Sequence, residues 1–256
     1  MCQVTVLSIT NPELLDAYID YSDKLQDIND YLELTNTLDN IKNPTLLGES
    51  ITSNESVSLA IQRNLKKTLR SSTYLLLYNL IESTMTACID AIYSTLKRLE
   101  IQHHSQNTDY FIFLLRDSIV KHILKQYGSI FSNDGIITIS NSRISVFNTI
   151  IDKGYDKKEL FNGNIDYAVI REEAKKFGFN VRPLNPPEGL FDPEDILNIK
   201  TNRNILAHGG ETFSECGNRL SIGEMSKKFN STVNMLNAVF IAIDNYLVSE
   251  SFYETA

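Results

Sequence analysis

Apolar side chains recur at intervals of three and four residues through the first forty positions of the chain. The recurring set is Leu14, Leu15, Tyr18, Tyr21, Leu25, Ile28, Tyr31 and Leu32. This spacing places one face of an α-helix against a core. Asn11 followed by Pro12 is a typical helix start, because asparagine caps the first turn and proline fits its first position. We therefore predict a helix from there to about Asn40, then a loop over residues 42–55, where Asn, Ser, Thr, Gly and Pro gather.

The helical spacing continues through the middle of the chain. It predicts a long helix over residues 56–99, with a break near residues 71–73, where Ser, Ser and Thr are adjacent weak helix formers. Thr108 is expected to cap the next helix, and Gly128 is expected to end it after Tyr127.

Three more helices are expected in the second half, over residues 164–177, 192–208 and 221–248. Ser221 with Glu224 forms a capping box for the last of them. The connection before that helix is polar, and its residues 219–222 are expected to be extended.

A different period covers residues 135–147. Ile136, Ile137 and Ile139, and then Ile144, Val146 and Phe147, flank a central Asn-Ser pair, which predicts a short β-hairpin. The predicted fold class is therefore all-α, a mostly helical bundle with a small hairpin insertion. We divide the chain into an N-terminal helical extension with its loop, residues 1–55, and a main helical domain, residues 56–256.

Composition places the chain among soluble globular proteins. Of its 256 residues, 42% are hydrophobic, and no secretory signal pattern is seen at the N-terminus. Apolar runs such as residues 74–81 are too short to cross a bilayer. Cys2, Cys88 and Cys216 are widely spaced, which favours reduced thiols in a cytoplasm over disulfides or a zinc knuckle. We expect a cytoplasmic protein without a membrane segment.

The helix over residues 192–208 carries the candidate chemistry. Asp192 and Pro193 mark its start, and Gly209-Gly210 marks its end. His208 falls in the last turn, Asn204 lies one turn earlier on the same face, and Arg203 precedes it.

Arginine and histidine together suit the cleavage of RNA without a metal. An imidazole can take the proton of the ribose 2′-hydroxyl or deliver one to the leaving oxygen. A guanidinium can hold two phosphate oxygens and never loses its charge. The alternative is a surface arginine followed by a histidine that caps the helix, because the bare spacing of the two residues is common.

The positions of the two residues also indicate a shared site. Arg203 and His208 are about 140° apart around a helix, and the chain offers only one histidine in such a setting. Both observations point to a site that a second copy of the chain completes.

A longer string, residues 203–222, resembles the HEPN superfamily (higher eukaryotes and prokaryotes nucleotide-binding). It is similar to a prokaryotic branch whose signature helix reads Arg-Asn-x-Leu-Ala-His-Gly, followed by a segment matched here by Thr212, Phe213, Glu215, Cys216 and Gly217. Residues 74–82, 161–166 and 175–179 also look like that branch. The resemblance covers roughly residues 56–247.

The resemblance implies that two signature helices meet across a two-fold axis and that both Arg-His pairs line one cleft. His208 would be general base or acid, Arg203 the phosphate clamp, and Asn204 would orient either of them. No metal and no cofactor are implied. The implied function is that of an endoribonuclease of a prokaryotic conflict system, toxin–antitoxin or anti-phage. RNA and a second copy would be its partners, with an antitoxin or neighbouring-gene protein as a further candidate.

Other polar residues have weaker claims. Asn79 and Glu82 interrupt an apolar helical run, and an acid there could orient Arg203; they could equally be polar residues at a helix boundary. His103 and His104 are expected at the surface. His122, close to Arg116, Lys121 and Lys125, is also expected to be exposed.

The formal charge of −8 weighs against an RNA partner, because nonspecific RNA binding usually needs a basic surface. Two rivals therefore stay open. One is a non-catalytic HEPN module that binds nucleotide or a partner protein through the same motif. The other is an antitoxin-like or scaffold protein with no nucleic-acid role.

Overall fold

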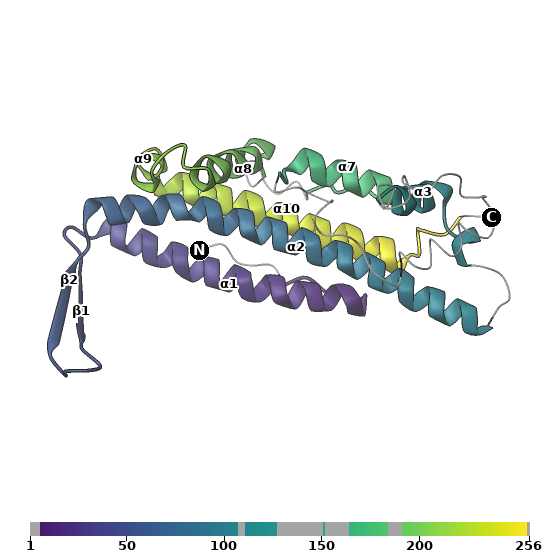
Figure 1. The fold of residues 1–256 in the computed structure, drawn as a ribbon, viewed down its shortest axis with the longest axis horizontal. Coiled ribbons are helices and arrows are strands. Elements are labelled where there is room, and N and C mark those ends of the chain that lie inside the picture. The colour runs from purple at the N-terminus through teal and green to yellow at the C-terminus, as the bar shows by residue number, and fades with distance from the viewer. Residues whose placement is uncertain (1–5, 107–110, 127–150, 152–163, 184–190, 255–256) are drawn as a thin grey trace, which may run out of the picture.

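Three long helices form the body of the molecule, in a computed structural model that describes residues 6–106, 111–126, 151, 164–183 and 191–254. They are α1 (Pro12–Asn40), α2 (Arg63–Gln106) and α10 (Ile222–Val248). The shorter helices are α3 (Asp117–Gln126), α7 (Tyr167–Phe177), α8 (Pro193–Ala207) and α9 (Phe213–Asn218). They lie on the opposite side of α2 and α10 from α1 (Figure 1). The predicted class, all-α with a small β-hairpin, is confirmed.

The first helix begins and ends where the sequence predicts. The side chain of Asn11 accepts the N–H of Leu14 at 3.0 Å, which satisfies one of the first-turn donors. Asp244 of α10 accepts the backbone N–H groups of Thr10 and Asn11. Ile41 is extended and ends the helix. Since Asn11 and Asp244 are both buried, these bonds fix the start of α1 against α10.

The second helix corrects two expectations. It begins at Arg63, not at residue 56, and it runs unbroken through residues 71–73. Ser72 donates its hydroxyl to the carbonyl of Thr68 at 2.9 Å, and Ser71 bonds the same carbonyl at 3.0 Å. Ser71 and Thr73 are buried, so packing of this face in the core outweighs their weak helix propensity and the helix continues. At 1.5 Å per residue, its 44 residues span about 66 Å.

The hairpin lies where we expected a loop and the start of the second helix. Strand β1 (Thr45–Glu49) pairs antiparallel with β2 (Ser56–Ala60), so the loop prediction for residues 42–55 is wrong. Every residue of both strands is exposed, and the hairpin projects past the end of the bundle (Figure 1). Strand β1 lacks the alternation of polar and apolar residues by which strands are recognised, and in β2 that alternation covers only residues 56–59. The hairpin predicted over residues 135–147 lies outside the described residues.

Three further boundaries differ from the predictions. After a 3-10 turn over Phe111–Phe113, α3 begins at Asp117; Thr108, the expected cap, lies outside the described residues. Helix α7 begins at Tyr167 with Asp166 as its cap, three residues later than expected. The polar connection before α10 contains α9, because Thr212 and Glu215 form a capping box. The capping box of α10, Ser221 with Glu224, is confirmed.

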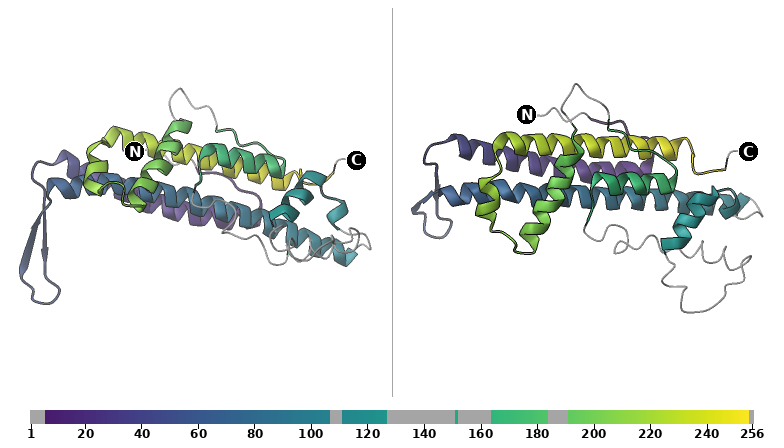
Figure 2. Two further views of the ribbon diagram at one scale, coloured as in Figure 1. Left: turned by 45° about the horizontal axis from the view of Figure 1, so that its top comes forward. Right: turned by 90° about the horizontal axis from the view of Figure 1, so that it is seen from above.

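Helix α1 shares one continuous core with the rest of the described chain. The ring of Phe240 on α10 lies 5.2 Å from the rings of both Tyr18 and Tyr21 on α1. From above, α1 and α10 lie alongside α2, whose C-terminal end extends beyond both of them (Figure 2). The N-terminal helix therefore packs as a member of the bundle.

Helix α2 also passes a test of length and composition for a membrane span, over Arg63–His103. Buried apolar residues of its middle, such as Leu77, Ile81 and Ile92, belong to the common core. Such burial is what the central helix of a soluble bundle shows, and length and composition alone are weak grounds for a span.

Candidate functional site

Helix α8 has the ends that its sequence predicts. Asp192 accepts the N–H of Glu194 at 3.0 Å, and Pro193 opens the first turn. His208 is the C-cap, and its N–H reaches the carbonyl of Asn204 at 3.0 Å. Gly209 follows with φ of +70°, a left-handed conformation that glycine adopts without strain. The chain therefore leaves the helix directly after the histidine.

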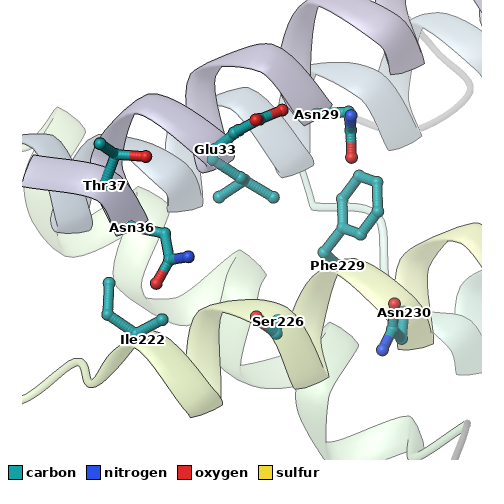
Figure 3. Close-up of a pocket in the computed structure, with 9 residues that line it drawn as sticks. Asn29, Glu33, Asn36, Thr37, Ile222, Ser226, Phe229 and Asn230 are labelled. Atoms are coloured by element: carbon teal, nitrogen blue, oxygen red, sulfur yellow. The ribbon is translucent and has the colours of Figure 1, made fainter. Parts of the chain in front are cut away.

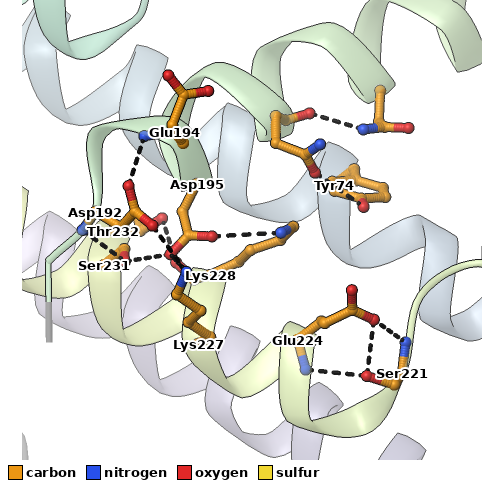
Figure 4. A network of polar contacts seen from close by, with 12 residues as sticks. Tyr74, Asp192, Glu194, Asp195, Ser221, Glu224, Lys227, Lys228, Ser231 and Thr232 are labelled. Carbon is orange, nitrogen blue, oxygen red and sulfur yellow. Dashed lines mark hydrogen bonds and ion pairs between the residues drawn. The ribbon is translucent and has the colours of Figure 1, made fainter. Parts of the chain in front are cut away.

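A buried ionic network fixes the start of α8 to α10 (Figure 4). Asp195 accepts the hydroxyl of Ser231 at 2.7 Å and lies 3.4 Å from the ammonium of Lys228. Lys227 bonds Asp192 at 2.8 Å from the solvent side. Since the side chains of Asp195 and Lys228 are 5% and 10% exposed, this pair is largely removed from water.

The middle of α8 is joined to α2 and α9. The hydroxyl of Tyr74 donates to the side chain of Asn198 at 3.1 Å. The thiol of Cys216 on α9 lies 3.7 Å from the side-chain oxygen of buried Asn202. At Gly217 a Cβ would come within 1.8 Å of the carbonyl oxygen of Lys67. Glycine at that position lets α9 pack closely on the backbone of α2. From there α9 supports the C-terminal half of α8 through the contact of Cys216 with Asn202.

Arg203 lies on the face of an aromatic ring. Its guanidinium carbon is 4.4 Å from the centre of the Tyr78 ring on α2. Its Nη1 donates to the side-chain oxygen of Asn204 at 2.9 Å. Asn204 in turn donates from Nδ2 to Asn164 at 3.2 Å. The guanidinium is therefore held on one side by a ring and at one edge by an amide.

Tyr78 is buried, with 0% of its surface exposed. Burial raises the pKa of its hydroxyl, which accepts the backbone N–H of Ile165 at 3.1 Å. Three consecutive residues, the 164–166 segment, thus touch the site: Asn164 meets Asn204, Ile165 meets Tyr78, and Asp166 pairs with Lys200 of α8.

His208 is exposed, whereas Arg203 is partly buried against α2. Across the described chain, no hydrogen bond joins the imidazole to Arg203 or Asn204. The two groups are thus not joined within one chain, and their positions are about 140° apart around the helix. A single chain presents one arginine and one histidine at the same end of α8 without joining them.

The family model described as MAE_28990-like HEPN matches residues 18–252. The chain belongs to the HEPN superfamily. No curated protein and no solved structure matches it. Membership indicates an RNA-related nuclease or a nucleotide-binding module, and the match extends over most of α1 as well as the signature helix.

Among the described residues, the two weaker candidates in this HEPN domain form no hydrogen bond or ion pair with Arg203. Asn79 is exposed and lines a hollow with Lys24 and Asp27 of α1, away from α8. Glu82 lies one turn beyond Tyr78, and its charge contributes to the raised pKa of that tyrosine. No ion pair between Glu82 and Arg203 is present among the described residues.

Sequence reasoning missed Tyr78. Its spacing from Tyr74 and Glu82 places all three on one face of α2. That face could have been recognised as the one that meets the signature helix. The apolar run around Tyr78 does not indicate that its ring, and not the carboxylate of Glu82, would contact Arg203.

The described histidines outside α8 offer no second centre. His122 was expected at the surface, and this is wrong: its side chain is 9% exposed, lies 3.5 Å from Glu173 and packs on Phe177 at 4.7 Å. The Phe177 and Glu173 side chains come from α7, which covers the face of α3 that carries the histidine. No cluster of His, Cys, Asp and Glu suited to a metal occurs among the described residues.

A groove of about 590 Å³ runs between α1 and α10 (Figure 3). Amide and hydroxyl side chains line it together with Phe229, and its one charged lining residue is Glu33. Without a cation, the groove is poorly suited to phosphate. None of the candidate site residues lines it.

Proposed function

We propose that this HEPN protein is a metal-independent endoribonuclease of a prokaryotic conflict system, toxin–antitoxin or anti-phage. One observation carries the proposal. The end of α8 presents an exposed imidazole at His208 and a guanidinium at Arg203 whose plane is held by Tyr78. These are the proton-transfer group and the phosphate clamp that cleavage through the 2′-hydroxyl needs.

The chemistry balances without any further reactant. A neutral imidazole takes the proton of the 2′-hydroxyl, and the 2′-oxygen attacks phosphorus. Arg203 stabilises the charge on the pentavalent phosphate. The bond from phosphorus to the 5′-oxygen breaks, and a protonated imidazole donates to that oxygen. The products are a 2′,3′-cyclic phosphate and a 5′-hydroxyl, and DNA is not cut because it lacks the attacking group.

A homodimer supplies the second imidazole. The divergence of Arg203 and His208 on one helix supports a cleft that two copies of α8 line around a two-fold axis. One His208 then acts as base and the other as acid, while Asn204 orients the guanidinium to which it is bonded. RNA and a second copy are the partners of the site, and a neighbouring-gene antitoxin is a further candidate.

The net charge of −8 favours the other candidate, a non-catalytic HEPN module that binds nucleotide or a partner protein. In that case α8 serves recognition only. The two candidates differ in whether the purified protein breaks RNA.

The deciding assay incubates the purified chain with total cellular RNA in EDTA. Wild type should cleave, and His208→Ala and Arg203→Ala should each cut at least about 100-fold more slowly while keeping the helical circular dichroism spectrum. Arg182→Ala and His103→Ala, which change the same residue types away from α8, should cleave like wild type. Full activity in the two site variants, or loss of cleavage in EDTA, contradicts the mechanism. An inactive wild type favours the binding module.

A further inference from the structure

The contact between Tyr78 and Arg203 is more specific than packing alone requires. The guanidinium carbon of Arg203 on α8 lies over the buried ring of Tyr78 on α2, 4.4 Å from the ring centre. The hydroxyl of the same ring accepts the N–H of Ile165 at 3.1 Å. The ring is therefore fixed at its far end by the 164–166 segment while its face supports the arginine.

An aromatic face holds a guanidinium differently from a carboxylate. A carboxylate forms two hydrogen bonds with the fork of an arginine and thereby occupies the donors that a phosphate would use. A ring attracts the cation through its quadrupole and leaves the N–H groups at the edge free for other acceptors. In the described structure only Nη1 of Arg203 is engaged, by Asn204, out of five donors that a guanidinium carries.

We propose that Tyr78 is a positioning residue for Arg203, holding the guanidinium plane so that its open edge can receive an RNA phosphate. This inference rests on the proposed function for the use of that phosphate in cleavage. The contact between Tyr78 and Arg203 is independent of the proposed function. It predicts that Arg203 binds a phosphate whether or not the RNA chain is then cut.

The test uses two substitutions at Tyr78 and one matched control. Tyr78→Leu removes the ring, and Tyr78→Phe keeps the ring but loses the hydroxyl that accepts from Ile165. Tyr74→Leu removes a second buried tyrosine one turn earlier on the same helix, whose hydroxyl bonds Asn198 and not Arg203. It controls for general loosening of α2 against α8.

The first readout is the affinity for a fluorescent RNA in which every ribose carries a 2′-O-methyl group, so that binding is measured without cleavage. Tyr78→Leu should weaken binding by about 3- to 30-fold, the range of a desolvated cation–ring contact. Tyr78→Phe should largely restore it, and Tyr74→Leu should stay within about twofold of wild type. In an Arg203→Ala background, Tyr78→Leu should have no further effect.

The second readout is cleavage of an unmodified RNA. Tyr78→Leu should lower kcat by a similar factor, and Tyr78→Phe should recover most of that loss. Additive effects of Tyr78→Leu and Arg203→Ala, or equal losses in Tyr78→Leu and Tyr74→Leu, overturn the positioning role and leave the proposed function standing. A wild type that binds the methylated RNA with the predicted coupling but cuts nothing overturns the proposed function and supports the positioning role. A wild type that binds no RNA overturns both.

Discussion

Two neighbouring lysines on α10 hold the start of α8 in unequal surroundings. Lys228 pairs with Asp195 where both side chains are nearly enclosed, and Lys227 reaches Asp192 and Asp195 from a position that is half open to water. A charge left alone in an enclosed site costs far more than one at the surface. The helix that carries the motif therefore depends on one lysine much more than on the other.

We expect Lys228→Ala to lower the free energy of unfolding by about 3 kcal/mol, because it removes the enclosed cation of the buried Asp195 carboxylate. Of the described cations, only the half-exposed Lys227, 3.6 Å away, then remains beside that carboxylate. Lys227→Ala, the matched exposed change, should cost less than about 1 kcal/mol. Urea denaturation followed by circular dichroism measures both. Equal losses in the two variants would show that burial of the pair does not govern its contribution.

The proton-transfer role of His208 predicts a particular rate profile. If one imidazole must be neutral and its two-fold mate protonated, the cleavage rate should rise and then fall between about pH 5 and 8. Single-turnover cleavage across this range measures the profile. A rate that climbs steadily with pH would assign the reaction to hydroxide and the motif to structure.

At the scale of elements, the sequence predicts features that depend on neighbouring residues, such as helix caps. It does not predict those that depend on contacts between distant parts of the chain. Asn11, Asp192 and the Ser221–Glu224 box cap their helices as predicted, because a cap is a hydrogen bond within a few residues. The predicted break at residues 71–73 is absent. Intrinsic helix propensity does not include the contribution of the core around a helix, and here that contribution is larger.

The candidate site divides in the same way. Three of the candidate residues lie within six consecutive positions, and the sequence alone reveals them: Arg203, Asn204 and His208. Tyr78 could not, because its role arises only where α2 crosses α8, and an apolar run does not disclose which ring faces the arginine. Glu82, the acid proposed in its place, lies on the right face of α2 but makes no ion pair with Arg203 in the described chain.

The hairpin is the element least connected to the rest. Its ten strand residues are exposed, and Ile61 bonds the carbonyl of Pro44 across its base at 2.8 Å. Replacing residues 45–60 with a two-glycine link should change the unfolding temperature by less than about 3 °C, because no core contact is lost. Leu77→Ala, a change in the core, should cost about 2–5 kcal/mol in the same thermal melts. A large loss on hairpin removal would show that the bundle needs it.

The pairing of α7 with α8 should make stability depend on acid. Burial alone would raise the pKa of Asp166, but Lys200 and the N–H of Val169 together lower it below its ordinary value of 3.8. A lowered carboxyl pKa gives stability that is present above that value and is lost as pH falls through the folded pKa. Lys200→Met should therefore be less stable than wild type at pH 6, and the difference should shrink towards pH 2. Urea titrations at each pH measure it, and a difference that stays constant contradicts the assignment.

At the scale of the whole molecule, the proposed enzyme is a pair of chains. Mixing an Arg203→Ala chain with a His208→Ala chain should restore part of the cleavage, above either parent but below wild type. The mixed cleft holds one arginine and one imidazole, whereas each parent lacks one of these groups altogether and wild type has two of each. A chain with both changes, mixed with His208→Ala, contains no His208 and should recover nothing. Recovery in neither mixture, with subunit exchange verified by mass spectrometry, would place each site within one chain.

The exposed hairpin gives the molecule a second way to associate. A closed pair built on α8 stops at two copies, because a two-fold contact uses the same surface on both partners. Among the described residues, β1 and β2 pair only with each other, which leaves one edge of each strand open, and Leu47 and Val57 are exposed along them. A hairpin with two open edges can pair with a strand of another copy on each side, so assembly through it is open-ended. If the proposed two-fold contact on α8 closes at two copies, the edges of the hairpin remain as the surface through which such pairs would join into a fibre.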